Sequence, residues 1–566
     1  MSDLKRVPIG IEDFKEMIDK DYYFVDKTLL IKELIDNLAK VQLFTRPRRF
    51  GKTLNMKMIQ RFFETTPESN AYLFDGLAIT KAGEKYMKEQ GKYPVIFLTL
   101  KELGASDYES ALKSFKEIIR YEYTRHQEVL ESPKLNEKEK ELFTLFLNEE
   151  ADELSYRSAI KFLSDCIYKT TGTKAIILID EYDVPLDYAW QNGFYDKMID
   201  FIRTALSSAL KTNDSLEFAC LTGCLRISKE SIFTGLNNFD VHSITNDLFS
   251  DCFGFTEAEV KKMLEYYNLN SKMNEVKEWY DGYLFGQKEI YNPWSVLKFL
   301  KDANANPKVS CSAYWSNTSS NAIVKDLVQN ADLETKQKIE TLINGGTVKA
   351  ELHEEIVYAD VQTKIDGIWN MLMLTGYLKP IKIESVDVMR VATLKIPNKE
   401  INFIYRGIIS DWIKEEIRNP ANESNKVFEA LVAGNAEELQ DEISFWLKST
   451  ISYFDAQELF YHGFMTALLA QHKGYLTKSN RENGDGRTDI TVESYPRSDV
   501  AIVIELKVAK TLDTLADKAD EALAQAVANN YDREYKLMGY KKVIKYGISF
   551  WKKTCNVRIA EEKIYK

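Results

Sequence analysis

Two groups of residues near opposite ends of the chain combine types and spacings that could act on phosphate esters. The first is the run RPRRFGKTL at 46–54, in which Gly51, Lys52 and Thr53 form the end of a GxxxxGK[ST] phosphate-binding loop. In such a loop, backbone amides face the phosphates, the lysine neutralises the β and γ groups, and the hydroxyl holds magnesium. Because Arg46 stands where the motif has its first glycine, a chance GKT in a basic loop is the competing interpretation.

An apolar run that ends in carboxylates favours the phosphate-binding interpretation. AIILIDEYD at 175–183 has the pattern of a buried parallel strand that delivers acids at its carboxyl edge. There Asp180 would hold magnesium through water, and Glu181 would orient or deprotonate the attacking water. The alternative is a buried strand with ordinary acidic ends. A further strand at 216–227 ends near Arg226, which is either a sensor of the γ-phosphate or a solvated arginine.

The second group lies in GRTDI at 486–490 and IELKV at 504–508. The carboxylates of Asp489 and Glu505 are hard oxygen ligands of the kind that magnesium prefers, and the metal would activate water for attack on a phosphodiester. Lys507 would position or polarise the nucleophile, and strand alternation puts it on the same face as Glu505. The alternative is that IELKV is a plain amphipathic strand.

The elements that must hold these residues follow from hydrophobic periodicity. Residues 41–45 predict a strand, 46–52 a loop and 53 onward a helix, with another strand at 92–100. Residues 255–300 predict helices, of which the first is capped at Thr256, and the aromatics there, including Trp294, could hold a base or form core. From 365 onward the pattern predicts a helix, strands and a helix. Residues 454–551 predict a helix, strands, a second helix and a last strand.

Composition and charge bound the class of protein. With 566 residues, the chain is long enough for three or four domains, and 45% hydrophobic residues supply material for packed cores. A net charge of -11 restricts any nucleic-acid contact to a local basic patch, for which 536–566, with nine Lys and Arg, is a candidate. The other reading of that stretch is a solvated basic surface.

The cysteines and the hydropathy of the chain indicate in which cellular compartment we expect the protein. The six cysteines lack the spacing of a disulfide framework or a zinc site, and only five histidines are present. The start of the chain has no signal-peptide pattern, and no apolar run approaches the ~20 residues that span a bilayer. We therefore expect a cytoplasmic protein that makes no membrane contact, and we leave its oligomeric state open.

Several segments together resemble one family. The run at 8–34 that begins PIGIEDFKEMIDKDYYFVDKT, then RPRRFGKTL, LIDEYDVPL, TGCLRISKESIFTGLNN, WYDGYLFG and YNPWSVL are similar to the bacterial AAA-ATPase-like family. In that family the loop reads RPRRFGK[ST], so the resemblance makes Arg46 an expected residue, and we count Arg46 and Arg49 among the nucleotide-binding residues. The resemblance implies ATP binding more strongly than hydrolysis.

The same family pairs this region with a C-terminal domain of the PD-(D/E)xK nuclease superfamily. The resemblance implies that Asp489, Glu505 and Lys507 form the cutting site, and that Glu458 on the preceding helix is an extra metal ligand. It also places Gln525 and Tyr531 near the scissile phosphate, on the helix after the paired strands.

The predicted chain is an α/β protein of four parts. These are a P-loop domain with a parallel sheet at 1–250, a helical lid at 251–330, a winged-helix-like middle region at 331–425, and a restriction-endonuclease-like α/β domain at 426–566. Without a basic recognition helix, the middle region is expected to pack rather than to bind DNA.

The predicted function is ATP binding, with ATP hydrolysis, together with magnesium-dependent cleavage of DNA or RNA. In this hypothesis the state of the nucleotide changes the lid and the middle region and so gates the cutting site. The alternative is a switch without catalysis, which binds ATP and uses the nuclease-like domain for docking.

Overall fold

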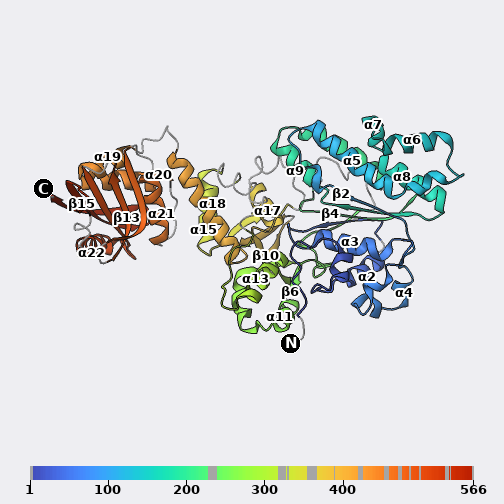
Figure 1. Ribbon diagram of the computed structural model, residues 1–566, viewed down its shortest axis with the longest axis horizontal. Helices are drawn as coiled ribbons and strands as arrows, with labels where there is room; N and C mark the ends of the chain where they lie inside the picture. The colour runs from blue at the N-terminus through green and yellow to red at the C-terminus, as the bar shows by residue number, and fades with distance from the viewer. Residues whose placement is uncertain are drawn as a thin grey trace. The chain divides into compact units, whose positions relative to one another are not determined.

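The structure is a computed structural model of the full chain (Figure 1). It describes residues 4–563 except 38, 227–238, 316–326, 328–330, 354–365, 388, 419–424, 451–457, 470–473, 484–485, 496–498, 529–534 and 536. The chain divides into two compact units, one made of 1–320 and 349–401 and the other of 321–348 and 402–566. The finer division into four parts stays a prediction, since the lid and most of the middle region pack with the first unit.

The first unit is built on a five-stranded parallel sheet. Its strands are β1 (Val41–Thr45), β2 (Val95–Thr99), β3 (Ala175–Asp180), β4 (Leu216–Gly223) and β5 (Phe239–His242), in the spatial order β2-β3-β4-β1-β5. β1 and β3 are buried along their whole length, as expected for strands with helices on both faces. Because all neighbours are parallel, the phosphate loop after β1 and the acids after β3 emerge at the same edge.

Helices cover both faces of this sheet. Figure 1 shows α5 (Tyr108–Arg125) and α8 (Ala159–Thr171) on one side, and α2 (Leu29–Asp36) and α3 (Lys52–Phe63) on the other. The remaining helices of this region are α1 (Phe14–Asp19), α4 (Glu84–Met87), α6 (Glu137–Leu147), α7 (Glu153–Tyr156), α9 (Val184–Gln191) and α10 (Tyr195–Leu210). The predicted parallel sheet of the N-terminal α/β domain is confirmed.

The predicted lid contains α11 (Glu257–Tyr266), α12 (Met273–Tyr280) and α13 (Pro293–Ala305). Thr256 caps α11 through a reciprocal capping box with Glu259, as the sequence predicts. A small antiparallel sheet was not predicted; it consists of β6 (Phe255–Thr256), β7 (Tyr283–Phe285) and β8 (Lys288–Tyr291) in the order β6-β8-β7. Such two- to four-residue strands are too short for their periodicity to be recognised in a sequence.

The middle region has a second small sheet. β9 (Val348–Glu351), β10 (Lys379–Val386) and β11 (Met389–Lys395) lie in the order β10-β11-β9, with α15 (Leu333–Ile343), α17 (Gly367–Leu374) and α18 (Lys399–Arg418) around them in sequence. All eight residues of α17 are buried, so the helix that precedes the β10-β11 hairpin offers no surface to a DNA groove. This agrees with the expectation that the winged-helix-like region packs.

The second unit ends in a mixed five-stranded sheet. Its strands are β12 (Tyr475–Asn483), β13 (Gly486–Ser494), β14 (Val500–Val508), β15 (Lys542–Trp551) and β16 (Thr554–Lys563), paired in sequence order, with only β14 and β15 parallel. Figure 1 shows α22 (Leu515–Ala528) on one face, and α19 (Asn425–Ala433), α20 (Ala436–Thr450) and α21 (Glu458–Leu469) on the other. The predicted restriction-endonuclease-like α/β architecture is confirmed.

One glycine allows α22 to pack closely on this sheet. A Cβ on Gly547 would lie 2.2 Å from the backbone nitrogen of Leu523 and 2.5 Å from the carbonyl oxygen of Ala519. Gly547 is also the register partner of Glu505 across the parallel β14-β15 pair. The close helix therefore sits over the strand position that carries a predicted metal ligand.

Candidate functional sites

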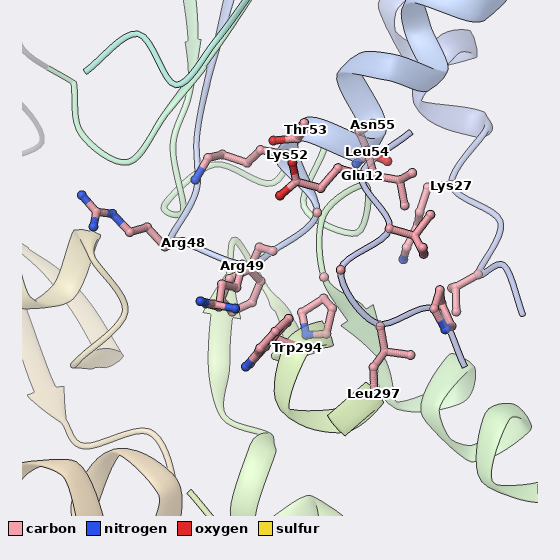
Figure 2. Close-up of a pocket in the computed structure, with 18 of the residues that line it drawn as sticks. Glu12, Lys27, Arg48, Arg49, Lys52, Thr53, Leu54, Asn55, Trp294 and Leu297 are labelled. Atoms are coloured by element: carbon pink, nitrogen blue, oxygen red, sulfur yellow. The ribbon is translucent and has the colours of Figure 1, made fainter. Parts of the chain in front are cut away.

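A cavity of about 500 Å³ opens beside the phosphate loop in the first unit. Its lining includes five chain segments: 8–12 and 23–27 near the N-terminus, the loop at 48–55, the turn around Glu181, and the start of α13 (Figure 2). The lining combines charged groups such as Lys52 and Glu181 with apolar side chains such as Ile11 and Leu297, and Figure 2 shows Lys52 and Leu297 on opposite sides of the cavity. This volume falls in the range of small-molecule and cofactor sites.

The loop takes the conformation that its predicted role requires. Gly51 has φ 82°, a left-handed conformation that glycine adopts without strain, and it directly precedes α3. The ammonium of Lys52 points back into the loop, 3.2 Å from the carbonyl oxygen of Arg46, 3.3 Å from that of Pro47 and 3.3 Å from Glu181 Oε1. Burial lowers the pKa of Lys52, but the neighbouring Cys224, Glu181 and other acids outweigh it and raise that pKa, so Lys52 stays charged.

Asp180 is held from two sides. The Thr53 hydroxyl donates to Asp180 Oδ2 at 2.7 Å, and the Thr222 hydroxyl donates to Asp180 Oδ1 at 2.5 Å. Thr222 lies on β4, which runs between β1 and β3, so the fold places it between the loop and the acids. Burial and the adjacent Glu181 raise the pKa of Asp180. A cation at this point would favour the ionised carboxylate.

Glu181 faces the cavity with spare acceptor capacity. Its backbone has φ 55°, an uncommon value for a side chain of this size, directly after β3. Within the described part of the chain, its Oε2 is buried and lacks a hydrogen-bond partner. A buried carboxylate oxygen without a partner is costly, so this atom fits a site that gains a donor when a ligand and its water enter.

Asp183 is a functional candidate that motif matching missed. Its Oδ2 accepts hydrogen bonds from the backbone nitrogens of Cys224 at 2.7 Å and Leu225 at 2.9 Å, which fixes the turn after β4. Burial and the nearby Glu181 raise the pKa of Asp183 to about 6. The sequence feature that could have identified Asp183 is its position at the end of the DEYD run, residues 180–183. Arg226 follows this turn, half-buried and outside the cavity lining, directly before residues 227–238, which the structure does not describe.

The three arginines of the loop have different surroundings. Arg46 is fully buried, and its guanidinium donates to the carbonyl oxygens of Thr45, His242 and Phe249. It is not part of the cavity lining, and its contacts tie the loop to the chain after β5, so the nucleotide contact of Arg46 stays a prediction. Arg48 and Arg49 both line the cavity, and Arg48 also pairs with Asp187 at 2.8 Å.

In the second unit, neighbouring strands bring Asp489 and Glu505 together. Ile490 pairs with Ile504 across the antiparallel β13-β14 ladder, and one further step sets Asp489 opposite Glu505, with both side chains on one face. The backbone nitrogen of Leu506 donates to Asp489 Oδ2 at 2.9 Å. The two acids therefore directly follow the last described pair of this ladder on neighbouring strands.

Groups around this acid pair hold it in place. Gln525 Nε2 on α22 donates to the buried Glu505 Oε2 at 3.1 Å, and His462 Nε2 on α21 lies 2.9 Å from the carbonyl oxygen of Asp489. Lys507 is half-buried, two residues from Glu505 on the same strand face. Glu458 is the first residue of α21, but its side chain is outside the described part, and Tyr531 lies outside the described residues.

The two folds and sites define a P-loop-type nucleotide-binding domain followed by a nuclease-like domain. Residues 8–233 match the family described as "Predicted AAA-ATPase", and residues 456–560 match the "PD-(D/E)XK nuclease superfamily". The chain therefore joins an AAA-ATPase-like domain to a PD-(D/E)XK nuclease superfamily domain, and it is a nucleotide-binding, nuclease-like protein. Domains of these two kinds generally use a nucleotide and a divalent metal.

One relative aligns with most of this chain. The protein named "Uncharacterized protein in vnfD 5'region" from Azotobacter chroococcum mcd 1 is 24% identical over 501 residues, which cover 86% of this chain and 87% of its own length. Among the described residues, no helix has the length and apolar character needed to cross a membrane.

Proposed function

We propose that the cavity of the first unit binds ATP with magnesium and hydrolyses it. The observation that carries this proposal is the convergence of Lys52, Thr53 and Glu181, from two separate segments, at the end of the cavity lined by the phosphate loop, where Thr53 donates a hydrogen bond to the buried Asp180. Lys52 would bind the β- and γ-phosphate oxygens, because its ammonium needs only to turn from the loop carbonyls toward the cavity.

The residues at this end fit a magnesium ion. Thr53 Oγ1 and Asp180 Oδ2 lie 2.7 Å apart, so both oxygens can serve one cation, Asp180 through a water molecule. Magnesium, when bound, would offset the charge of the β and γ phosphates. Glu181, with its free Oε2, would orient the attacking water and accept its proton.

We test nucleotide binding by calorimetric titration of the full chain with Mg-ATP. Lys52→Ala removes the charge that faces the phosphates, and we expect ATP affinity to fall by at least about tenfold. Lys88→Ala, which removes an exposed lysine outside the cavity lining, is the matched control. Equal ATP affinity in wild type and Lys52→Ala would remove the N-terminal assignment.

We further propose that the second unit cleaves nucleic-acid phosphodiesters with a divalent metal. Its support is the placement of Asp489 and Glu505 on one face of adjacent strands, with Gln525 bonded to Glu505. The two carboxylates would hold the metal, which activates water, and Lys507 would position or polarise that water.

The decisive assay is magnesium-dependent cleavage of plasmid DNA and of DNA and RNA oligonucleotides. Asp489→Asn or Glu505→Ala should abolish cleavage, because each removes one of two metal ligands. Asp499→Asn is a matched control, since this exposed acid precedes β14 and pairs with Lys541. Absence of cleavage by the wild type on every substrate, with magnesium or manganese, would overturn the nuclease proposal.

A second candidate is a nucleotide switch without catalysis. The observation that favours it is the buried Arg46 in place of the first loop glycine, which locks the loop to carbonyl oxygens of a distant segment. This candidate predicts ATP binding with phosphate release no faster than that of Glu181→Gln, and no nuclease activity. Phosphate release that Glu181→Gln abolishes would exclude it.

A further inference from the structure

Arg49 stacks on Trp294 inside the cavity. The central carbon of its guanidinium lies 4.0 Å from the ring centroid of Trp294, which is within the range of a cation–π contact (Figure 2). Both residues line the cavity. Lys298 lies 4.8 Å from the same ring but is not part of the cavity lining, so the Arg49 contact is the one on the cavity side.

The surroundings of this stack suit an aromatic base. Trp294 and Leu297 come from the first turns of α13, and Ile11 and Val25 come from the N-terminal segment. The loop residues Lys52, which is charged, and Thr53, which carries a hydroxyl, also line the cavity. A nucleotide has the same division, because its base has an apolar π-face and its phosphates carry the charge.

The guanidinium of Arg49 occupies the ring face that a base would use. At 4.0 Å from the ring centroid it leaves no space for a second planar group between them. A base that stacks on this face must therefore displace it. Arg49 has φ 70° and stands two residues before Gly51, so its backbone belongs to the phosphate loop itself. A displaced guanidinium remains within the loop that faces the phosphates, and arginine binds phosphate oxygens in a bidentate manner.

We propose that the base of the bound nucleotide stacks on Trp294 in place of Arg49, and that the released Arg49 turns to the phosphates. This proposal rests on the proposed nucleotide binding. Base recognition and phosphate binding are then coupled through one side chain. The site selects phosphate ligands that carry an aromatic base, because bare polyphosphate leaves Arg49 on the ring.

The test compares Mg-ATP with Mg-tripolyphosphate, which lacks the base, by calorimetric titration of the full chain. Trp294→Leu removes the stacking surface, and we expect it to weaken ATP binding about tenfold, the scale of one base-aromatic stack. The same change frees Arg49 from the ring, and we expect tripolyphosphate binding to become about 2- to 5-fold tighter. Opposite shifts for the two ligands cannot come from a general loss of structure.

Two further variants complete the test. Trp279→Leu is the matched control, because Trp279 packs against the core of the lid outside the cavity lining and should leave both affinities unchanged. Arg49→Ala should weaken ATP binding while adenosine binding stays equal or becomes tighter, since the ring face is then open. Thermal unfolding midpoints check that each variant is folded.

The outcomes separate this inference from the proposed function. If wild type binds ATP and Lys52→Ala loses it, but Trp294→Leu leaves ATP affinity unchanged, only the stacking inference fails. Parallel losses of ATP and tripolyphosphate affinity in Trp294→Leu would also overturn it. Absence of ATP binding by the wild type would instead remove the nucleotide assignment on which the inference rests.

Discussion

Lys52→Met tests whether Lys52 stabilises the empty nucleotide site as well as binding phosphate. The ammonium lies 3.3 Å from Glu181 Oε1, and Lys52 is 3% exposed. Removing one partner of a buried ion pair costs about 3–5 kcal/mol when the other charge stays ionised. Asp180 and Asp183, both buried nearby, share this cation, because Lys52 lowers the pKa of each. We therefore expect the free energy of unfolding to fall by about 3 kcal/mol near pH 8.

The loss of stability caused by Lys52→Met should be larger near pH 8 than at acidic pH. Burial and Glu181 raise the pKa of folded Asp183 from 3.8 to about 6, so the folded state binds this proton more tightly than the unfolded chain. In the wild type, this group makes the protein less stable as pH rises from about 4 to about 6. Without Lys52 the pKa of folded Asp183 rises further, because Lys52 lowers it. The pH range over which the protein loses stability then extends toward neutral pH. Near pH 5.5 a larger fraction of folded Asp183 is protonated and needs no cation, so Lys52→Met should destabilise the protein less there than near pH 8.

Urea unfolding of the full chain at the two pH values measures these costs. Lys52→Met combined with Glu181→Gln should regain part of the lost stability near pH 8, because the second change removes an unpaired carboxylate. Lys57→Met on the same helix, α3, is the matched control, since Lys57 lies over the ring of Phe97 and its loss should show little dependence on pH. A cost that is equal at both pH values, or that Glu181→Gln does not reduce, would refute this reasoning.

Three further predictions concern other parts of the molecule. Gly547→Ala should lower the free energy of unfolding, measured by urea denaturation, by at least about 2 kcal/mol, because the added Cβ would meet the backbone of α22. Gly407→Ala is the control, since no atom lies within 4 Å of its added Cβ, and it should leave the free energy of unfolding unchanged or raise it. Burial raises the pKa of Glu400 from 4.5 to about 7, so the free energy of unfolding should fall by about 3 kcal/mol as pH rises through this interval. Urea unfolding at several pH values should show this fall in the wild type and a smaller fall in Glu400→Gln. Gln525→Leu should raise the magnesium concentration for half-maximal cleavage about tenfold, because Gln525 orients Glu505, and an unchanged requirement would exclude this positioning role.

Local patterns in the sequence were sufficient to predict the strands and the helix start that carry or precede the candidate site residues. The strand predicted at 41–45 has those bounds in the structure, and the apolar run from 175 forms β3 and ends at Asp180. Thr256 predicts a helix start, and in the structure it caps α11 in a capping box with Glu259. These features depend on neighbours within a few residues, so they can be recognised without knowledge of the fold.

Chemical requirements extended the prediction to contacts between distant segments. Thr53 and Asp180 are 127 residues apart, and the type of each residue predicted a shared magnesium site where the structure has a hydrogen bond. Asp489 and Glu505 were likewise expected on adjacent strands, and they lie on β13 and β14, one residue beyond the paired Ile490 and Ile504. A motif conveys such contacts because phosphate and metal chemistry require fixed combinations of groups.

The sequence by itself determined the two α/β domains, the phosphate loop and the acid pairs. Only the tertiary structure decided what surrounds the individual side chains. Arg46 has the type and position of a phosphate ligand, yet it is buried by carbonyl oxygens 196 and 203 residues further along the chain. Trp294 faces the cavity, whereas the neighbouring aromatics Tyr280 and Tyr291 are buried in the lid core. Whether a charged or aromatic side chain meets solvent, core or ligand depends on which remote segments pack around it, and no local pattern records that.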